Sequence, residues 1–340
     1  MPRRNEYSLA NEINHRESRY RGNSEINNRY NGSSRDPFYS FLRTVSLCSS
    51  RLDCTNRIDA NRSMEPQIVS PLTSFRSNGN PTSRAHSYDG SYLRAYTQYC
   101  SPVITSYGTI SIRLQRNIRV DITVDKAVRV VNLPGRCVAA INCLGDRSCI
   151  VHPSCKILQE GVTVNMEIGN RLVKFSKRGI TFTSLGHSLV YLVDASGTKS
   201  TVEYFRSFNY DVSSDVFFTK STCGKKALNN CFLKIENFVH RYKNNGNKIW
   251  IIADVCIQQN LLGDVCVTRD FSRRVIHTSP TLGTMSVSTP CVYMAAGCDP
   301  ERYVFVQRGK KKLNSHVRSF KVKNGTQVAG YDCKGKLILH

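Results

Sequence analysis

The stretch between Gly135 and Phe205 constrains the fold most, because turn residues recur along it at intervals of roughly 8 to 10 residues. The turn pairs are Pro134-Gly135, Gly145-Asp146, Pro153-Ser154, Glu160-Gly161, Gly169-Asn170, Arg178-Gly179, Gly186-His187 and Ser196-Gly197. Between two of these turns, apolar residues occupy every second position: Val162, Val164, Met166 and Ile168. A strand with that period has one apolar and one wet face, so the stretch predicts a meander of short antiparallel strands.

The same alternation continues on both sides of this stretch. It begins at Thr109, and a tight turn at 115–117 separates the first two expected strands. Further expected strands are 128–133, 138–143, 148–152, 171–176, 180–184, 188–193, 248–258, 261–269, 275–277, 284–288, 291–296 and 303–307. Near the end of the chain, Asn324-Gly325 is a strong hairpin signal. The predicted fold class is mainly β, with antiparallel meander sheets in two blocks, 105–222 and 247–340.

One packed helix is expected between the two blocks, within residues 223–246. Its apolar residues follow helical spacing: Leu228, Phe232, Ile235, Val239 and Tyr242. Asn244-Asn245-Gly246 would end it. The continuously apolar run 189–193 is typical of a strand buried on both faces. We therefore expect the helix, over about 225–243, to cover the second face of the sheet at that strand.

Residues 1–104 differ in composition from the rest of the chain. They are rich in Arg, Asn, Ser and Tyr, and they contain 14 arginines and no lysine. A segment with so little apolar surface cannot offset its ordering entropy, so we predict a disordered tail. Ser46 and Ser87 each follow an arginine by three residues, a spacing that basophilic kinases accept, and both are phosphorylation candidates. The alternative is a solvated spacer with chance serines.

The formal net charge is +23, from 48 Lys and Arg against 25 Asp and Glu. This charge favours acidic partners such as nucleic acid, anionic lipid surfaces or acidic protein tails. No apolar run approaches the roughly 18 residues of a membrane span, and the first residues lack a signal-peptide core. We therefore expect an intracellular protein without membrane attachment, cytoplasmic or cytoskeletal, with the nucleus as an alternative. In that setting the 14 cysteines are expected to be reduced thiols.

One cysteine pattern raises the question of a metal site. Cys137, Cys143, Cys149 and Cys155 are spaced by six residues, and His152 is centred between the last two. Thiolate and imidazole are zinc ligands, so the candidate ligands are Cys143, Cys149, His152 and Cys155. The paired C-x2-C spacing is absent, however, and the favoured interpretation is that these cysteines are small apolar strand residues. We expect no metal and no other cofactor.

Catalytic signatures are absent from the sequence. None of the patterns G-x-x-x-x-G-K-[ST], G-x-G-x-x-G, G-x-S-x-G and H-E-x-x-H occurs. His187 and Ser188 are adjacent, so on a strand they would point to opposite faces and could not pair as base and nucleophile. We expect a protein that is not an enzyme.

Basic residues recur on the expected wet faces. The candidates for partner binding are Lys174, Lys177, Arg178, Arg308, Lys310, Lys311 and Lys312. Such a face can track a phosphate backbone, but it can also keep edge strands from pairing with other chains. Aromatic residues for base stacking are few on these expected faces, and no ribonucleoprotein motif occurs. The basic run 308–312 is expected to form a turn and is also a candidate nuclear-import signal.

Residues 139–158 resemble a known β-meander. The segment reads AAINCLGDRSCIVHPSCKIL and covers about 20 of the 340 residues. It resembles flagellar central-apparatus proteins of the sperm-associated-antigen and glutamate-rich type, in which a strand ends in His-Pro-Asn-Gly and large apolar residues start the next. His152-Pro153 and Ile157-Leu158 match this pattern, whereas Ser154-Cys155 replaces the Asn-Gly pair. The resemblance implies a non-catalytic interaction protein of a cilium or flagellum.

The predicted function is a non-catalytic β-rich adaptor or scaffold that binds a protein partner through a sheet edge or a basic face. A cytoskeletal or flagellar assembly is the expected setting. A sheet edge can bind an extended peptide through main-chain hydrogen bonds, which requires no catalytic residue. The alternative is a basic RNA- or DNA-binding protein.

Overall fold

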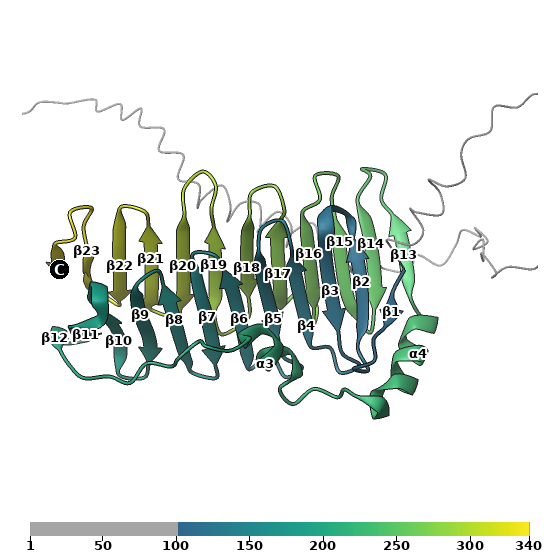
Figure 1. The fold of residues 1–340 in the computed structure, drawn as a ribbon, viewed down its shortest axis with the longest axis horizontal. Helices are drawn as coiled ribbons and strands as arrows, with labels where there is room; N and C mark the ends of the chain where they lie inside the picture. The colour runs from purple at the N-terminus through teal and green to yellow at the C-terminus, as the bar shows by residue number, and fades with distance from the viewer. Residues whose placement is uncertain (1–100, 340) are drawn as a thin grey trace, which may run out of the picture. The chain divides into compact units, whose positions relative to one another are not determined.

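The computed structural model describes residues 101–339, which form two twelve-stranded antiparallel sheets (Figure 1). Within each sheet, neighbouring strands follow one another directly in the sequence, so both sheets are meanders. The predicted fold class, mainly β with antiparallel meander sheets in two blocks, is confirmed. The predicted tail, apart from residues 101–104, lies outside the described residues, and so do Ser46 and Ser87.

Sheet A is formed by the first twelve strands. They are β1 (Val103–Ile104), β2 (Ile110–Leu114), β3 (Ile118–Ile122), β4 (Val128–Asn132), β5 (Cys137–Ile141), β6 (Arg147–His152), β7 (Cys155–Glu160), β8 (Thr163–Ile168), β9 (Arg171–Ser176), β10 (Gly179–Thr183), β11 (Val190–Asp194) and β12 (Gly197–Ser200). A one-turn 3-10 helix at Gln115–Asn117 joins β2 to β3, which confirms the tight turn predicted there.

Sheet B is formed by the last twelve strands. They are β13 (Val239–Tyr242), β14 (Lys248–Ile252), β15 (Val255–Gln259), β16 (Val265–Arg269), β17 (Arg274–Ser279), β18 (Thr284–Ser288), β19 (Tyr293–Gly297), β20 (Tyr303–Arg308), β21 (Lys311–His316), β22 (Ser319–Asn324), β23 (Gln327–Tyr331) and β24 (Leu337–Leu339). The predicted Asn324-Gly325 hairpin joins β22 to β23, and Gly325 has a φ of +64°, which glycine adopts without steric cost.

The two sheets pack face to face and share one core. Strands β5 and β6 contact β18, and β10 and β11 contact β22. Early strands of one sheet therefore lie against early strands of the other, and late strands against late strands (Figure 1). Every second residue of most strands points into this core, which explains the period-two alternation of the sequence. Trp250 of sheet B and Phe175 and Phe182 of sheet A are among its largest fully buried side chains.

Polar side chains at strand ends link the two sheets. Asn132 Nδ2 donates hydrogen bonds to Thr278 Oγ1 at 2.8 Å and to the Ser279 carbonyl at 3.1 Å. Gln259 Nε2 donates to the Gln115 carbonyl at 2.9 Å, and the Gln115 amide donates to Gln259 Oε1 at 3.1 Å. These bonds satisfy buried polar groups and fix the position of one sheet on the other.

Residues 201–238 connect the two sheets and contain helices α3 (Val212–Phe218) and α4 (Leu228–Glu236). Helix α3 packs on β4, β5 and β6, on the outer face of sheet A (Figure 1). Its side chains Val216 and Phe217 are buried against Cys149 and Leu158. Asp211 caps its start by accepting hydrogen bonds from the amides of Ser213 and Ser214. Neither helix in residues 101–339 is long and apolar enough to span a membrane.

The helix expected over about 225–243 is shorter than its apolar pattern indicates, and a different helix covers sheet A. A 3-10 turn at Lys225–Ala227 precedes α4, and the chain leaves the helix after Glu236 because Val239–Tyr242 pairs with β14. The buried face of α4 contains Cys231, whereas Phe232 is 58% exposed. The additional helix α3 covers the outer face of sheet A, but it lies over β4, β5 and β6 and not, as expected, over the strand at 189–193.

Three further predictions, two of strands and one of a turn, differ from the structure in detail. The expected strand 248–258 is a hairpin of β14 and β15, whose turn residues Ala253 and Asp254 both have positive φ although alanine is not a usual turn residue. The basic run expected to form a turn partly belongs to a strand, since β21 begins at Lys311. The run 189–193 is buried on both faces only at its end, where Leu192 and Val193 point to opposite faces and are buried, whereas Leu189 lies before β11 and is 52% exposed.

Candidate functional site

The basic residues on the outer face of sheet A contact the connection between the sheets. Lys174 Nζ lies 2.8 Å from Glu203 Oε1 and donates to the Tyr204 carbonyl at 3.3 Å. Arg147 Nη2 lies 2.8 Å from Asp215 Oδ2 and 2.6 Å from Glu160 Oε1. Lys174, a predicted partner-binding residue, therefore holds the connection in place.

The other predicted partner-binding residues lie on two hairpins of different sheets. Lys177 and Arg178 are exposed in the turn between β9 and β10. In the second hairpin, Arg308 pairs with Lys311 across β20 and β21, and both are half-buried on the side that faces sheet A. Lys310 is exposed at the turn and Lys312 is exposed on the outer face. The seven candidates therefore do not form one cluster.

A lysine surface on sheet B is formed by Lys310, Lys312, Lys321 and Lys323, all of which are exposed. Lys312 and Lys323 lie directly opposite each other on β21 and β22, and Lys321 lies opposite Asn314. None of the four has an acidic partner within residues 101–339. From Tyr303 onward the chain contains nine Lys and Arg against a single acidic residue, Asp332, so acidic neighbours are scarce.

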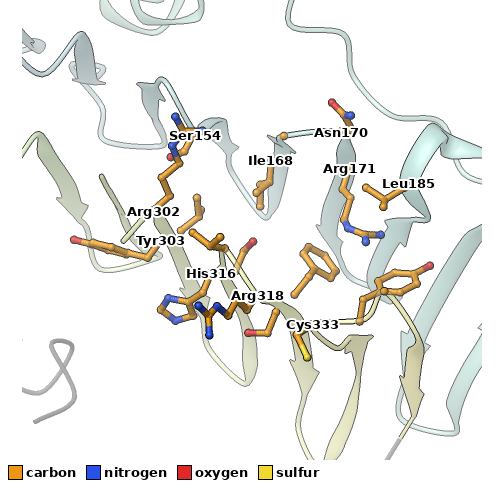
Figure 2. Close-up of a pocket in the computed structure, with 18 of the residues that line it drawn as sticks. Ser154, Ile168, Asn170, Arg171, Leu185, Arg302, Tyr303, His316, Arg318 and Cys333 are labelled. Carbon is orange, nitrogen blue, oxygen red and sulfur yellow. The ribbon is translucent and has the colours of Figure 1, made fainter. Parts of the chain in front are cut away.

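A cavity of about 630 Å³ lies between hairpin turns of the two sheets (Figure 2). Sheet A contributes the turns β6–β7 and β8–β9, and sheet B contributes β21–β22 and β23–β24. Figure 2 shows Arg171 entering from sheet A, and Arg302, His316 and Arg318 from sheet B. Lys334 also lines the cavity, and Asp332 is the one acidic residue among its lining residues. The cavity is therefore strongly cationic.

Arg171, at the start of β9, is the buried cation of this cavity, with 9% of its surface exposed. Its guanidinium carbon lies 3.9 Å from the ring centroid of Tyr331 and 5.2 Å from that of Phe320. Nη1 donates to the Thr183 carbonyl at 3.3 Å. Burial lowers the pKa of this guanidinium, but an arginine stays protonated in proteins. No acidic residue within 101–339 pairs with it.

Comparison with known proteins identifies a family. A family described as "Domain of unknown function (DUF8796)" matches residues 101–340. The chain belongs to this family. Its description names no activity, and no curated protein matches the chain.

Several solved structures show a distant similarity to this DUF8796 chain. The TCP10 domain of Danio rerio CPAP in complex with a STIL peptide is 10% identical, with 68% of this chain and 97% of that chain covered and a TM-score of 0.23. The TCP domain of Drosophila melanogaster SAS-4 (dCPAP) in complex with a proline-rich motif of Ana2 (dSTIL) is 8% identical, with coverages of 78% and 97% and a TM-score of 0.16. At such TM-scores the similarity carries no argument about fold or partner.

The candidate metal ligands are divided between the two faces of sheet A. Cys149 and Cys143 belong to the cluster beneath α3, where Cys143 Sγ lies 3.2 Å from the Lys220 carbonyl. His152 and Cys155 belong to the opposite face, because residues three apart on one strand point to opposite sides. Within residues 101–339, no group of three or more His, Cys, Asp or Glu side chains is arranged to hold a metal ion.

The two ring nitrogens of His152 already have partners. Nε2 lies 2.9 Å from the Gly283 carbonyl, and Nδ1 lies 2.6 Å from Ser154 Oγ. Burial lowers the pKa of His152 and raises the pKa of Cys149 and of Cys155 to about 12, so these thiols stay protonated at neutral pH. Buried, protonated thiols of this kind are typical of cysteines that pack as small apolar residues.

Arg171 is the residue that the sequence analysis missed, since it was only expected to begin a strand. A signal for it is present in the alternation. Arg171 occupies the same face of β9 as the buried residues Val173 and Phe175. A charged residue in register with core residues indicates a buried cation, which requires either a partner or a function.

Proposed function

We propose that this chain is a non-catalytic scaffold that binds an acidic segment of a partner protein on the lysine surface of sheet B. The observation that carries the proposal is the Lys312–Lys323 pair, in which two exposed cations lie directly opposite each other on adjacent strands. Like charges in that position destabilise a sheet. A bound acidic segment relieves this repulsion, so the partner gains affinity from it.

A sheet face is a better binding surface in this protein than a sheet edge. The four edge strands β1, β12, β13 and β24 contain 2, 4, 4 and 3 residues. An added peptide strand binds through a row of main-chain hydrogen bonds, and such short edges offer few of them. We therefore assign partner binding to the basic face rather than to an edge.

The resemblance of residues 139–158 to central-apparatus proteins supports a partner in a cytoskeletal assembly inside the cell. Acidic protein tails are frequent ligands of basic surfaces and require charge complementarity rather than a deep groove.

The lysine surface is tested by substituting Lys312, Lys321 and Lys323 with Gln in the full chain. We expect binding of a fluorescein-labelled poly-glutamate peptide to weaken about tenfold at roughly 50 mM salt, and the loss to shrink as salt rises. The matched control substitutes Arg113, Lys225 and Lys226, which are exposed and lie outside sheet B, with Gln. Equal binding by both triple variants would show that net charge, and not this surface, binds the peptide.

A second candidate function is RNA or DNA binding, and one observation favours it. Tyr303 and Phe305 lie on the outer face of β20, where Phe305 is opposite Asn314 and next to the lysine surface. Aromatic and basic side chains together bind single-stranded nucleic acid. Tighter binding of a uridine 12-mer than of poly-glutamate at about 150 mM salt, with a salt slope that falls by roughly 2 to 3 in the triple lysine variant, would favour this function.

A further inference from the structure

The cavity around Arg171 contains a buried cation without a counter-charge. Burying a guanidinium without an acidic partner is unfavourable, and its contacts with the faces of Tyr331 and Phe320 offset only part of that cost. Arg269 is a second buried arginine, and its partners differ from those of Arg171. Arg269 Nη2 donates to the Asn142 carbonyl at 2.7 Å, and Nε lies 3.4 Å from Asp270 Oδ2. Arg269 thus has a carboxylate partner within the fold. Arg171 has no carboxylate partner within residues 101–339, so it has capacity for an anion.

The rim of the cavity adds further positive charge. Arg302, Arg318 and Lys334 are exposed, and none of them forms an ion pair with another residue of 101–339. The acidic lining residue, Asp332, is engaged in its own turn, where Oδ1 accepts hydrogen bonds from the amides of Lys334 and Lys336, each at 2.9 Å. Four cations therefore face one carboxylate that is already hydrogen-bonded.

The volume of the cavity and its apolar lining residues indicate the kind of ligand to which the anionic group belongs. A volume of about 630 Å³ suits a ligand of many atoms rather than a single small ion. Leu185 and Val317, which also line the cavity, are 60% and 66% exposed. Apolar side chains beside cations fit a peptide in which an anionic residue has apolar neighbours.

We infer that this cavity binds a phosphorylated serine or threonine within a peptide segment of a partner. A phosphate carries a charge of about −1.5 to −2 at pH 7 and three strong acceptor oxygens, whereas a carboxylate carries a single charge. Arginine binds phosphate through two parallel hydrogen bonds, and the cavity contains three arginines. The site is separate from the lysine surface, so this inference does not depend on the proposed function.

The test measures binding of fluorescein-labelled Ala-Leu-phosphoSer-Leu-Ala to the full chain by fluorescence anisotropy. We expect this peptide to bind about tenfold or more tightly than its unphosphorylated form, with the Glu-containing form between them. Arg171→Gln should weaken binding about tenfold or more, and Arg302→Gln with Arg318→Gln should also weaken it. Arg113→Gln, which removes the same charge on β2, should leave binding unchanged.

Three results would overturn the inference. The first is equal affinity for the phosphorylated and unphosphorylated peptides. The second is wild-type affinity in the exposed double variant Arg302→Gln Arg318→Gln, which tests the site even if Arg171→Gln fails to fold. The third is displacement of the peptide by an equal concentration of inorganic phosphate, because the ligand would then be the free anion. Retained binding in the triple lysine variant separates this site from the lysine surface.

Discussion

The outer faces of the two sheets both carry basic residues, but several of these residues have acidic partners on sheet A and none has one on sheet B within residues 101–339. On sheet A, Arg129 lies 3.4 Å from Asp211, and Lys156 donates to the Phe208 carbonyl at 3.1 Å, as Arg147 and Lys174 also contact the connection. On sheet B, the lysine surface has no acidic partner within residues 101–339. A strand lysine is therefore paired or unpaired depending on whether a covering segment supplies carboxylates.

The connection between the sheets accounts for this difference. Glu203, Asp211 and Asp215 all belong to the part of the connection up to and including α3, which follows the outer face of sheet A (Figure 1). After Tyr303 the chain has a single acidic residue, and that residue is hydrogen-bonded within its own turn. Carboxylates thus lie beside basic residues on the outer face of sheet A but not beside the lysine surface of sheet B. Three substitutions test this difference, in order of decreasing expected effect.

The largest effect is expected from Phe217→Ala, which removes a buried aromatic side chain by which α3 packs on sheet A. Phe217 is 2% exposed, so we expect a loss of about 3 to 5 kcal/mol in the free energy of unfolding, measured by guanidinium denaturation. Phe232→Ala on α4 is the matched control, since that ring is 58% exposed and its loss should cost less than about 1 kcal/mol. Similar losses in both variants would show that α3 does not stabilise sheet A.

A smaller effect is expected from Arg147→Met. Its guanidinium contacts Glu160, Asp215 and the Thr219 hydroxyl, and its side chain is only 16% exposed. Removing it takes away the ion-pair partner of Asp215, whereas Glu160 keeps Arg206, so we expect a loss of about 2 kcal/mol in the same measurement.

The control for Arg147 is Lys220→Gln. Lys220 also pairs with a carboxylate, Asp146 at 3.4 Å, but both side chains are largely exposed. An exposed ion pair contributes little, so the change should stay within about 0.5 kcal/mol. If Arg147→Met were as mild as this control, the connection would not depend on its ion pairs.

The meander could be predicted from the sequence because its signals are local. Alternation and turn residues such as Asn324-Gly325 act within one hairpin, and the structure confirms them. The end of α4 depends instead on tertiary pairing, since Val239–Tyr242 leaves a helical pattern to join β14. The turn at Ala253-Asp254 was missed for a different reason, because alanine is not a usual turn residue.

The candidate site was predictable only where charge alone identifies it. Lys312 was found because a basic run is visible in the sequence, and it is exposed. The partner of Lys174 was not predictable, because Glu203 reaches it only through the path of the connection. The role of Arg171 depends on the stacking of the sheets, which brings Phe320 and Tyr331 beneath its guanidinium.

The smallest effect, but the sharpest test of the comparison, is expected from Lys323→Gln. Lys323 lies opposite Lys312, so removing one charge should raise the free energy of unfolding by a few tenths of a kcal/mol, about 0.2 to 0.5, at low salt. At about 1 M salt, where the screening length is roughly 3 Å, the gain should disappear.

The matched variant is Lys156→Gln on sheet A, whose lysine lies 3.9 Å from Glu167 and donates to the Phe208 carbonyl, so it should lower the free energy of unfolding by about 0.5 kcal/mol. Opposite signs for these two lysines would support the comparison. A loss in both would mean that Lys323 is stabilised by a negative charge within the chain, and the lysine surface would then have a structural role like that of sheet A.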